Sequence, residues 1–306
     1  MGACLPDTLP FATCDVFTDR AFAGNPLAIV EDAGALCTAQ MQTIAREFNL
    51  SETIFVMEPR DPAHSARVRI FFPTAEIPFA GHPTIGCAIH LALKTAPEGD
   101  FHCTITLEEE AGLVPVTVTR QNGRLSAELT APVLPFATEA LLPGTSLLAE
   151  MLGLAQSDIG FGTHGPGVFE GGPAFLYVPV KTRSALAKAR PLEPHWSQVM
   201  ALTEVDSAYL YTLSDQGISA RMFSPTAGIP EDPATGSASA ILAAQLLASG
   251  ELTEGATTID LEQGEDMGRP SQLTLRVEVE NAALKAVRVA GSAVAISRGI
   301  ITVPAT

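Results

Sequence analysis

The apolar residues of the first 130 positions alternate between strand-like runs and helix-like spacing. Short runs rich in branched and aromatic residues predict strands at 11–17, 26–30, 52–57, 67–72, 103–107 and 113–119. A helix is predicted to begin at Thr38, with an apolar face made of Met41, Ile44, Ala45 and Phe48. A second helix should follow Pro83, a residue suited to a first turn, and bury Ile85, Ala88, Ile89 and Leu93.

The remaining positions repeat this alternation. They predict a helix at 147–154 and strands at 174–180, 208–213, 218–223, 273–279 and 284–289. A helix of small residues should run from about Gly236 to Ala248 and end at Ser249-Gly250. One prominent helix in each half, among many strands, predicts an α+β fold in which a curled sheet surrounds a central helix, twice.

An internal repeat supports two copies of one fold. Arg69–Pro78 and Arg221–Pro230 align without a gap, and seven of the ten positions are identical. A match so far apart along the chain is too long in period for a solenoid. We therefore predict two pseudo-symmetric domains, 1–130 and 131–306, joined near 131–135, with the last strands free to return to the first half.

Composition and charge narrow the possible partners. Hydrophobic residues make up 46% and charged residues 17%, which is typical of a globular chain. A net charge of −16 argues against nucleic acid and anionic membrane surfaces as partners. An acidic substrate must therefore be bound by local donors.

The cysteines and the N-terminus favour a cytoplasmic protein. The five cysteines, Cys4 among them, are odd in number and include no Cys-x-x-Cys pair, so reduced thiols are expected. The first residues show no export signal, and no apolar run approaches 18 residues.

Each copy of the repeat leads into a helix start built from small residues. The first turn of a helix leaves about four backbone N–H groups unpaired and carries roughly half a positive charge. Gly81, Gly86, Gly236 and Ser237 are small enough to let a ligand approach these groups. Two such starts facing one cleft would bind a carboxylate or stabilise an enolate-like anion. The alternative is that small residues only let the helix pack closely in its sheet.

Five ordered motifs carry a resemblance to a known family. They are Asp15-Val-Phe-Thr-Asp19, Phe22-Ala-Gly-Asn-Pro26, Asn49-Leu-Ser-Glu-Thr53, Gly81-His-Pro-Thr84 and Glu231-Asp-Pro-Ala-Thr-Gly-Ser237. Over nearly its whole length the chain resembles the phenazine-biosynthesis isomerase-like (PhzF-like) family. The resemblance implies a diaminopimelate epimerase-like fold with the site between its halves, a homodimer, no cofactor and a small carboxylated substrate.

The resemblance also assigns roles to individual residues. It implies that Glu52 is the acid/base that moves a proton between two carbons, and that His82 and Asp232 hold polar groups of the substrate. Gly81, Gly236 and Ser237 would offer donors to the substrate carboxylate, and Asn25 would line the same cleft. Without the resemblance, Glu52 is more simply a solvated strand residue, His82 a structural donor and Asp232 a helix cap.

Other functions are less well supported by the sequence. A two-thiol racemase would need a cysteine at each helix start, where Ala80 and Pro233 stand, and Cys87 has Ser239 as its repeat partner. Gly160–Gly165 matches a dinucleotide fingerprint only in its letters, since it follows a helix and precedes a strand, so we predict a loop. His82, Cys87 and His90 do not share one helical face, which argues against a metal site. The pairs Asp260/Glu262 and Glu265/Asp266 are predicted to form a solvated edge.

Two classes of function remain open from the sequence. The first is a cofactor-independent isomerase. The second is a binding or scaffold protein that retains the cleft without turnover. The combination of Glu52, His82 and Asp232 favours the enzyme, because a scaffold would not need it.

Overall fold

The computed structural model of the protein describes residues 6–305, so Cys4 and the first five positions lie outside it. The described chain divides into unit 1, residues 6–130 with 290–305, and unit 2, residues 131–289. Within residues 6–305, no helix is long and apolar enough to cross a membrane.

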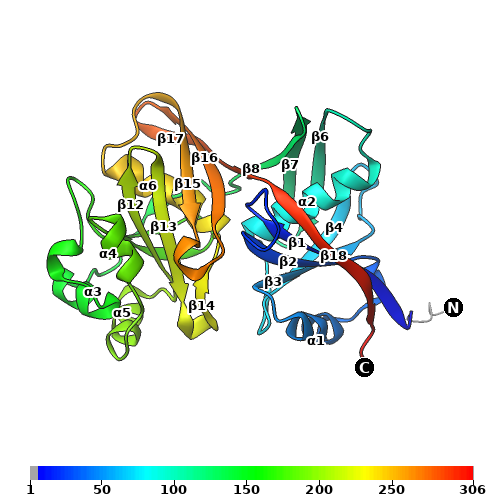
Figure 1. Ribbon diagram of the computed structural model, residues 1–306, viewed down its shortest axis with the longest axis horizontal. Helices are drawn as coiled ribbons and strands as arrows, with labels where there is room; N and C mark the ends of the chain where they lie inside the picture. Colours follow the sequence, from blue (N-terminus) through cyan, green and yellow to red (C-terminus); the bar gives the residue numbers. More distant parts are fainter. Residues whose placement is uncertain (1–5, 306) are drawn as a thin grey trace. The chain divides into compact units, whose positions relative to one another are not determined.

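Unit 1 is a mixed sheet with two helices (Figure 1). Its elements are β1 (Thr8–Val16), β2 (Asn25–Val30), α1 (Thr38–Phe48), β3 (Glu52–Met57), β4 (Ala66–Phe71), β5 (Glu76–Ile77), α2 (Gly81–Thr95), β6 (Phe101–Glu109), β7 (Gly112–Gln121), β8 (Arg124–Thr130) and β18 (Ala293–Thr302). The last strand, β18, pairs antiparallel with the first, β1.

Unit 2 contains more helices. Its elements are β9 (Phe136–Ala137), α3 (Thr145–Leu152), β10 (Gly167–Glu170), β11 (Ala174–Pro179), α4 (Arg183–Lys188), α5 (His195–Thr203), β12 (Ala208–Ser214), β13 (Gly217–Ser224), β14 (Ile229–Asp232), α6 (Gly236–Ala248), β15 (Gly255–Gln263), β16 (Ser271–Glu280) and β17, which ends at Gly291 (Ala283–Gly291). The strand and helix at 174–179 and 236–248 agree closely with prediction, whereas α4 and α5 were not predicted.

The strand pairing confirms the two copies of one fold. In unit 1 the steps from β1 to β2, β3 and β4 are antiparallel, parallel and antiparallel, and β4 then pairs parallel with β6. In unit 2 the steps from β10 to β11, β12 and β13 follow the same sequence, and β13 pairs parallel with β15. Along the chain, the helix α2 lies between β5 and β6, and α6 lies between β14 and β15. Each copy therefore has its helix at the same place in the order of elements.

The central helix of unit 1 packs closely against its sheet. Ile85, Ala88 and Ile89 are buried as predicted, but Leu93 is 41% exposed and Ala92 is buried instead. A Cβ at Gly86 would come within 2.7 Å of side-chain atoms of Val16 and Leu27. Gly86 therefore serves packing between α2 and the first two strands, and our assignment of it to ligand access was wrong.

The extra helices of unit 2 build a second core on its sheet. Trp196 of α5 is fully buried and packs with residues of α3 and α4 in one cluster. The helix α6 is buried over almost its whole circumference, which fits its content of alanine and leucine.

Candidate active site

A strained turn positions the first site residue in unit 1. The carboxylate of Asp15 accepts a hydrogen bond of 2.7 Å from the backbone N–H of Phe22, whose φ is +66°. Gly24 also has a positive φ, and a Cβ there would lie 2.3 Å from the carbonyl oxygen of Val16. This turn sets Asn25, which is fully buried, as the first residue of β2.

A carboxylate and an imidazole meet at the same end of the sheet. Glu52 is the first residue of β3, beside Leu27 of β2, and His82 stands in the first turn of α2. Their exposed fractions are 7% and 3%, so Glu52 is not the solvated side chain that its residue type alone suggests. The Nε2 atom of His82 lies 3.4 Å from Oε2 of Glu52.

The tautomer of His82 follows from its other partner. The ring also hydrogen-bonds the backbone of Pro26, and since proline has no N–H, the imidazole must donate to the carbonyl. Burial lowers the pKa of His82 to about 3, with this bond as a smaller opposing effect, so the ring is neutral at ordinary pH. Nδ1 therefore carries the proton, and Nε2 presents a lone pair toward Glu52.

The start of α2 offers backbone donors beside this pair. Its cap position is Ala80, whose side chain accepts nothing, and Pro83 contributes no N–H. The N–H groups of Gly81 and His82 are therefore the donors that this helix start presents, and the positive end of the helix dipole lies with them.

The corresponding start in unit 2 is organised around Asp232. Asp232 ends β14, and its Oδ2 accepts a hydrogen bond of 2.5 Å from the Thr235 hydroxyl. Thr235 is the cap residue of α6, so the interpretation of Asp232 as a cap is wrong. The Thr235 side chain accepts no hydrogen bond from the helix start, which leaves the N–H groups of Gly236 and Ser237 there.

The two helix starts are separated along the chain by a different number of residues from the two copies of the ungapped repeat. Gly81 and Gly236 both begin their helices. The hydroxyl of Thr84 donates to Ala80, 2.7 Å away, and that of Ser239 donates to Thr235, 2.9 Å away. Thr84, not Cys87, is thus the counterpart of Ser239, and Thr235, not Pro233, is the counterpart of Ala80. Neither cap position holds a thiol.

The acid of the first unit has no counterpart in the second. Thr53 pairs with Phe71, and Ala208 pairs with the equivalent Phe223. The counterpart of Glu52, one residue earlier, is therefore Ser207. The duplicated fold therefore carries a carboxylate at this position in one copy only. Within their own units, Glu52, His82 and Asn25 surround the start of α2, while Asp232 lies beside the start of α6.

Sequence reasoning missed the residues that brace each helix start. Arg69 pairs with both oxygens of Glu76 at 2.6 Å, and Arg221 pairs with both oxygens of Glu231 at 2.8 Å. Each guanidinium also lies over a phenyl ring two residues on, Phe71 or Phe223, at 5.2 and 4.7 Å from the ring centre. These contacts explain why both copies of the repeat retain arginine and phenylalanine.

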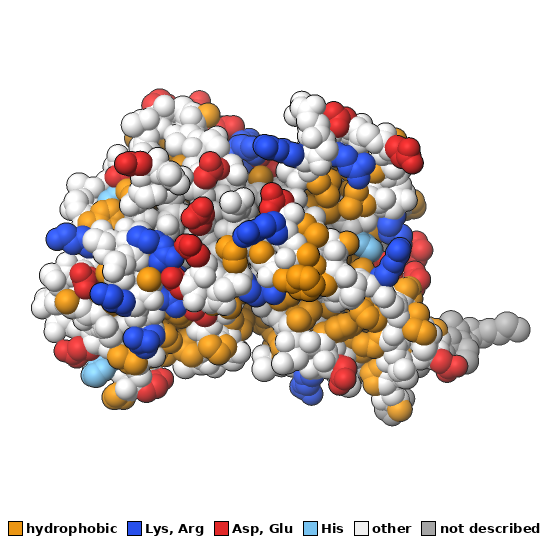
Figure 2. Space-filling view, viewed as in Figure 1, with side chains coloured by type: hydrophobic (Ala, Val, Ile, Leu, Met, Phe, Trp, Pro, Cys, Tyr) orange, Lys and Arg blue, Asp and Glu red, His pale blue; other side chains and the backbone are white. Residues whose placement is uncertain are grey.

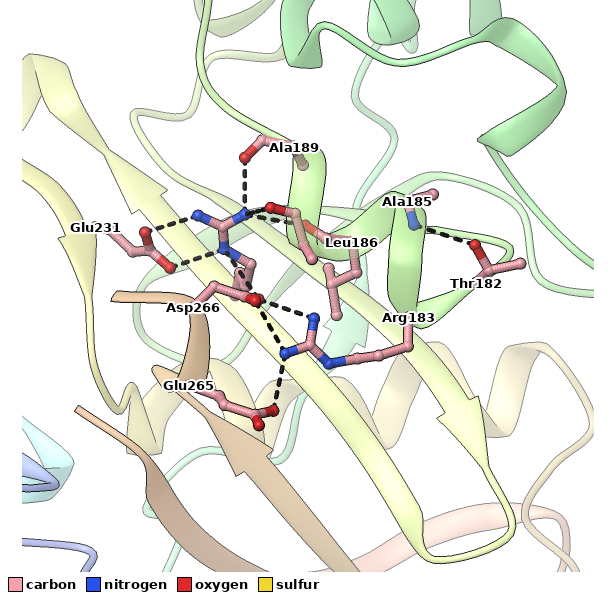
Figure 3. Close-up of polar contacts among 10 residues, drawn as sticks. Thr182, Arg183, Ala185, Leu186, Ala189, Glu231, Glu265 and Asp266 are labelled. Carbon is pink, nitrogen blue, oxygen red and sulfur yellow. Dashed lines mark hydrogen bonds and ion pairs between the residues drawn. The ribbon is translucent and has the colours of Figure 1, made fainter. Parts of the chain in front are cut away.

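The brace of unit 2 extends into a larger network (Figure 3). Arg221 also donates to the carbonyls of Leu186, Ala187 and Ala189 at the end of α4. Arg183 pairs with Glu265 and Asp266, and Asp266 lies 3.8 Å from Arg221. Glu265 and Asp266 are exposed, as predicted for a solvated edge, and they also form ion pairs with arginine.

The other candidate motifs do not join the site. Residues 160–165 form a turn, as predicted for the false dinucleotide fingerprint. His90 pairs with Glu31, which also holds Lys94. Acidic and basic side chains are interspersed on the face drawn in Figure 2, despite the large negative net charge.

The thiols near α2 are unsuited to proton transfer. Burial raises the pKa of Cys87 far above its ordinary value and that of Cys14 to about 12. We expect Cys87→Ala to leave kcat/KM within about twofold of wild type. A proton-transferring group usually contributes at least about a hundredfold to the rate. A loss larger than this in Cys87→Ala would indicate that the thiol takes part in the reaction.

Two similar α+β units, one with a buried carboxylate beside a neutral imidazole, define a protein of the diaminopimelate epimerase-like fold class. A family model described as phenazine biosynthesis-like protein (PhzC-PhzF) matches residues 14–299. The chain belongs to this family.

Relatives and solved structures agree with that assignment. The chain is 38% identical to an uncharacterized isomerase of Mesorhizobium japonicum, over 93% of this chain and 96% of the relative. It is 36% identical to the trans-2,3-dihydro-3-hydroxyanthranilate isomerase of Pseudomonas chlororaphis, over 95% and 98%. The crystal structure of a PhzF-family phenazine biosynthesis protein of Bacillus anthracis matches with a TM-score of 0.84 and 25% identity, over 97% and 99%. The protein is an isomerase of the PhzF type.

Proposed function

We propose that this isomerase moves a proton between two carbons of a small carboxylated ring substrate, without a cofactor, and that Glu52 is its acid and base. The relative from Pseudomonas chlororaphis is named for a hydroxyanthranilate, a ring that bears a carboxylate. A dihydro-hydroxyanthranilate, or a ring acid of similar size, is therefore the substrate class that we propose.

The observation that carries this proposal is the Glu52–His82 pair. A carbon-bound proton is hard to remove, so the base works best when it is desolvated and fixed donors face the developing charge. Glu52 is buried, and the N–H groups of Gly81 and His82 lie at the adjacent helix start. After Glu52 takes the proton, the lone pair on Nε2 of His82 can accept a hydrogen bond from the new acid, which holds the proton until it is returned.

The residues of unit 2 are proposed to bind the rest of the substrate. The N–H groups of Gly236 and Ser237 suit a carboxylate, because they stand at the positive end of α6. Asp232, whose Oδ2 already accepts from Thr235, would orient an amino or hydroxyl group, and Asn25 of unit 1 would contact the same substrate. A homodimer is part of the proposal, and light scattering on the purified protein would test it.

Incorporation of solvent deuterium tests the proposal directly. A ring acid such as trans-2,3-dihydro-3-hydroxyanthranilate, incubated in D₂O with the enzyme, should gain deuterium at the carbon that receives the proton. The competing function is a non-catalytic binding protein that retains the cleft. Binding of ring acids by calorimetry, with no exchange in any of them, would favour that second function.

A two-thiol racemase finds no support in the residues at the helix starts. Its mechanism needs one thiol at each helix start, and those cap positions hold Ala80 and Thr235. The single carboxylate of Glu52, with Ser207 at the equivalent place, supports a mechanism with one base.

A further inference from the structure

A second carboxyl group is buried against the first turn of α2, and the proposed mechanism does not use it. Glu109 is the last residue of β6 and is 8% exposed. Its Oε1 lies 2.6 Å from the hydroxyl of Thr84, while its Oε2 has no hydrogen-bond partner among residues 6–305. Thr84 stands two residues after His82 on the helix.

Two oxygens compete for the single proton of the Thr84 hydroxyl. The Thr84 hydroxyl is 2.7 Å from the carbonyl oxygen of Ala80, which can only accept. The hydroxyl also lies 2.6 Å from Oε1 of Glu109, and its one proton cannot fully satisfy both Ala80 and an ionised Glu109 at the same time. A proton on Glu109 would satisfy both contacts, because the Thr84 hydroxyl could then donate to Ala80 and accept from Glu109.

The second copy of the fold holds a neutral side chain at the same place. Leu107 of β6 stands beside Ala66 of β4, and Leu261 of β15 stands beside Ile218 of β13. Glu109 and Gln263, two residues further on, each end their strand. Gln263 also contacts the helix start, because its amide donates to the Thr235 hydroxyl at 3.0 Å. The duplicated position thus carries a carboxamide, which cannot ionise, in unit 2.

We infer that Glu109 is a positioning residue, held as the neutral acid, that ties the first turn of α2 to β6 and so fixes His82. Its role in turnover rests on the proposed function of His82. A carboxylate can only accept, so ionisation would draw the Thr84 hydroxyl away from Ala80 and loosen the turn that carries the imidazole.

The surroundings of Glu109 agree with a neutral acid. Burial raises its pKa from 4.5 to about 8, and donation from the Thr84 hydroxyl to the ionised carboxylate, which would lower the pKa, is the smaller effect. No arginine, lysine or histidine forms an ion pair with it among residues 6–305, and the thiol facing it is Cys87, itself near Cys14 and Glu31. Glu109 also lines a hollow of about 480 Å³. The other charged residues that line this hollow are Arg60, Arg67, Arg69, Glu76, Glu108 and Glu110.

A stability measurement tests the neutral state without any substrate. Because the folded pKa lies above the ordinary one, the folded protein binds more protons between about pH 4.5 and pH 8. The contribution of Glu109 to stability is thus fully present below that range and is lost as the pH rises through it. The Tm of Glu109→Gln should rise relative to wild type across the range and level off above it, whereas the exposed control Glu110→Gln should show no such trend. A constant difference for Glu109→Gln would overturn the neutral state.

Titration of the wild-type protein keeps the inference testable if the variant does not fold. In glutamate labelled with ¹³C at the carboxyl, one resonance should titrate near pH 8. The ¹⁵N signals of the His82 ring should shift with the same midpoint and stay constant in Glu109→Gln. A carboxyl resonance that titrates at low pH would contradict the neutral acid, and an unresponsive His82 would contradict the positioning role.

Turnover provides the third readout. With a ring acid that the enzyme isomerises, kcat/KM should fall as the pH rises through about 8, and Glu109→Gln should remove this alkaline fall. Retention of the fall in the variant would overturn the link to His82. If wild type shows no turnover at all, the proposed function fails, while the stability and resonance measurements still decide the state of Glu109.

Discussion

Replacing Glu52 with glutamine is expected to lower kcat/KM by at least about a thousandfold and to abolish deuterium exchange into the substrate. Glutamine has nearly the same shape, and its amide can still donate to Nε2 of His82, so the fold and the affinity for substrate should change little. It cannot take a proton from carbon. Stopped-assay turnover and ligand calorimetry on the same preparation would separate the two effects.

The matched control for this variant is Glu58→Gln, which removes an exposed carboxylate just beyond the other end of β3. It should retain wild-type turnover. Near-wild-type exchange in Glu52→Gln would show that another group is the base. A loss in both variants would point instead to a general effect of charge on a protein with a net charge of −16.

Replacing Arg221 with methionine should destabilise unit 2 by about 3–5 kcal/mol. The side chains of Arg221 and Glu231 are 8% and 14% exposed, so removal of the arginine leaves a shielded carboxylate without its partner. Three carbonyls at the end of α4 also lose their donor. Trp196 is the single tryptophan of the chain and lies in the core of this unit, so its fluorescence in urea would report the transition.

Arg69→Met is the natural control, because the equivalent pair in unit 1 is 23% and 29% exposed. An ion pair so accessible to water contributes about 1 kcal/mol or less to the free energy of unfolding. Arg69 also lies in unit 1, which has no tryptophan to report its loss. The Trp196 transition should therefore stay near that of wild type. A change of less than about 0.5 kcal/mol in Arg221→Met would mean that the brace adds little to stability.

Much of the fold followed from local sequence signals that the structure confirms. The helix α6 begins at Gly236 and ends before Ser249-Gly250, where small residues and glycine interrupt the apolar run. The helices α4 and α5 were missed because they are short, six and nine residues, and their burial comes from contacts with distant strands. Such contacts have no periodicity of their own within so few positions.

The candidate site was less accessible from the sequence. The burial of Glu52 depends on β2 and on α2, which lie far from it along the chain, so only the family motif singled it out. Glu109 lies in the run Glu108-Glu109-Glu110, which has the composition of a solvated charge cluster. Strand alternation carried the missing signal, since Ile105, Leu107 and Glu109 occupy every second position of β6 and are all buried.

The pairing of β1 with β18 has a consequence for synthesis on the ribosome. Unit 2 is one continuous stretch, 131–289, and every residue it needs has been made before the chain ends. Unit 1 is interrupted, because the partner strand of Thr8–Val16 is translated only after the whole of unit 2. At a synthesis rate of about 5–20 residues per second, the edge of β1 stays unpaired for tens of seconds before β18 is made. The half that carries Glu52 is therefore completed after the other half, and a stop codon soon after residue 289 would expose that edge while leaving the other half whole.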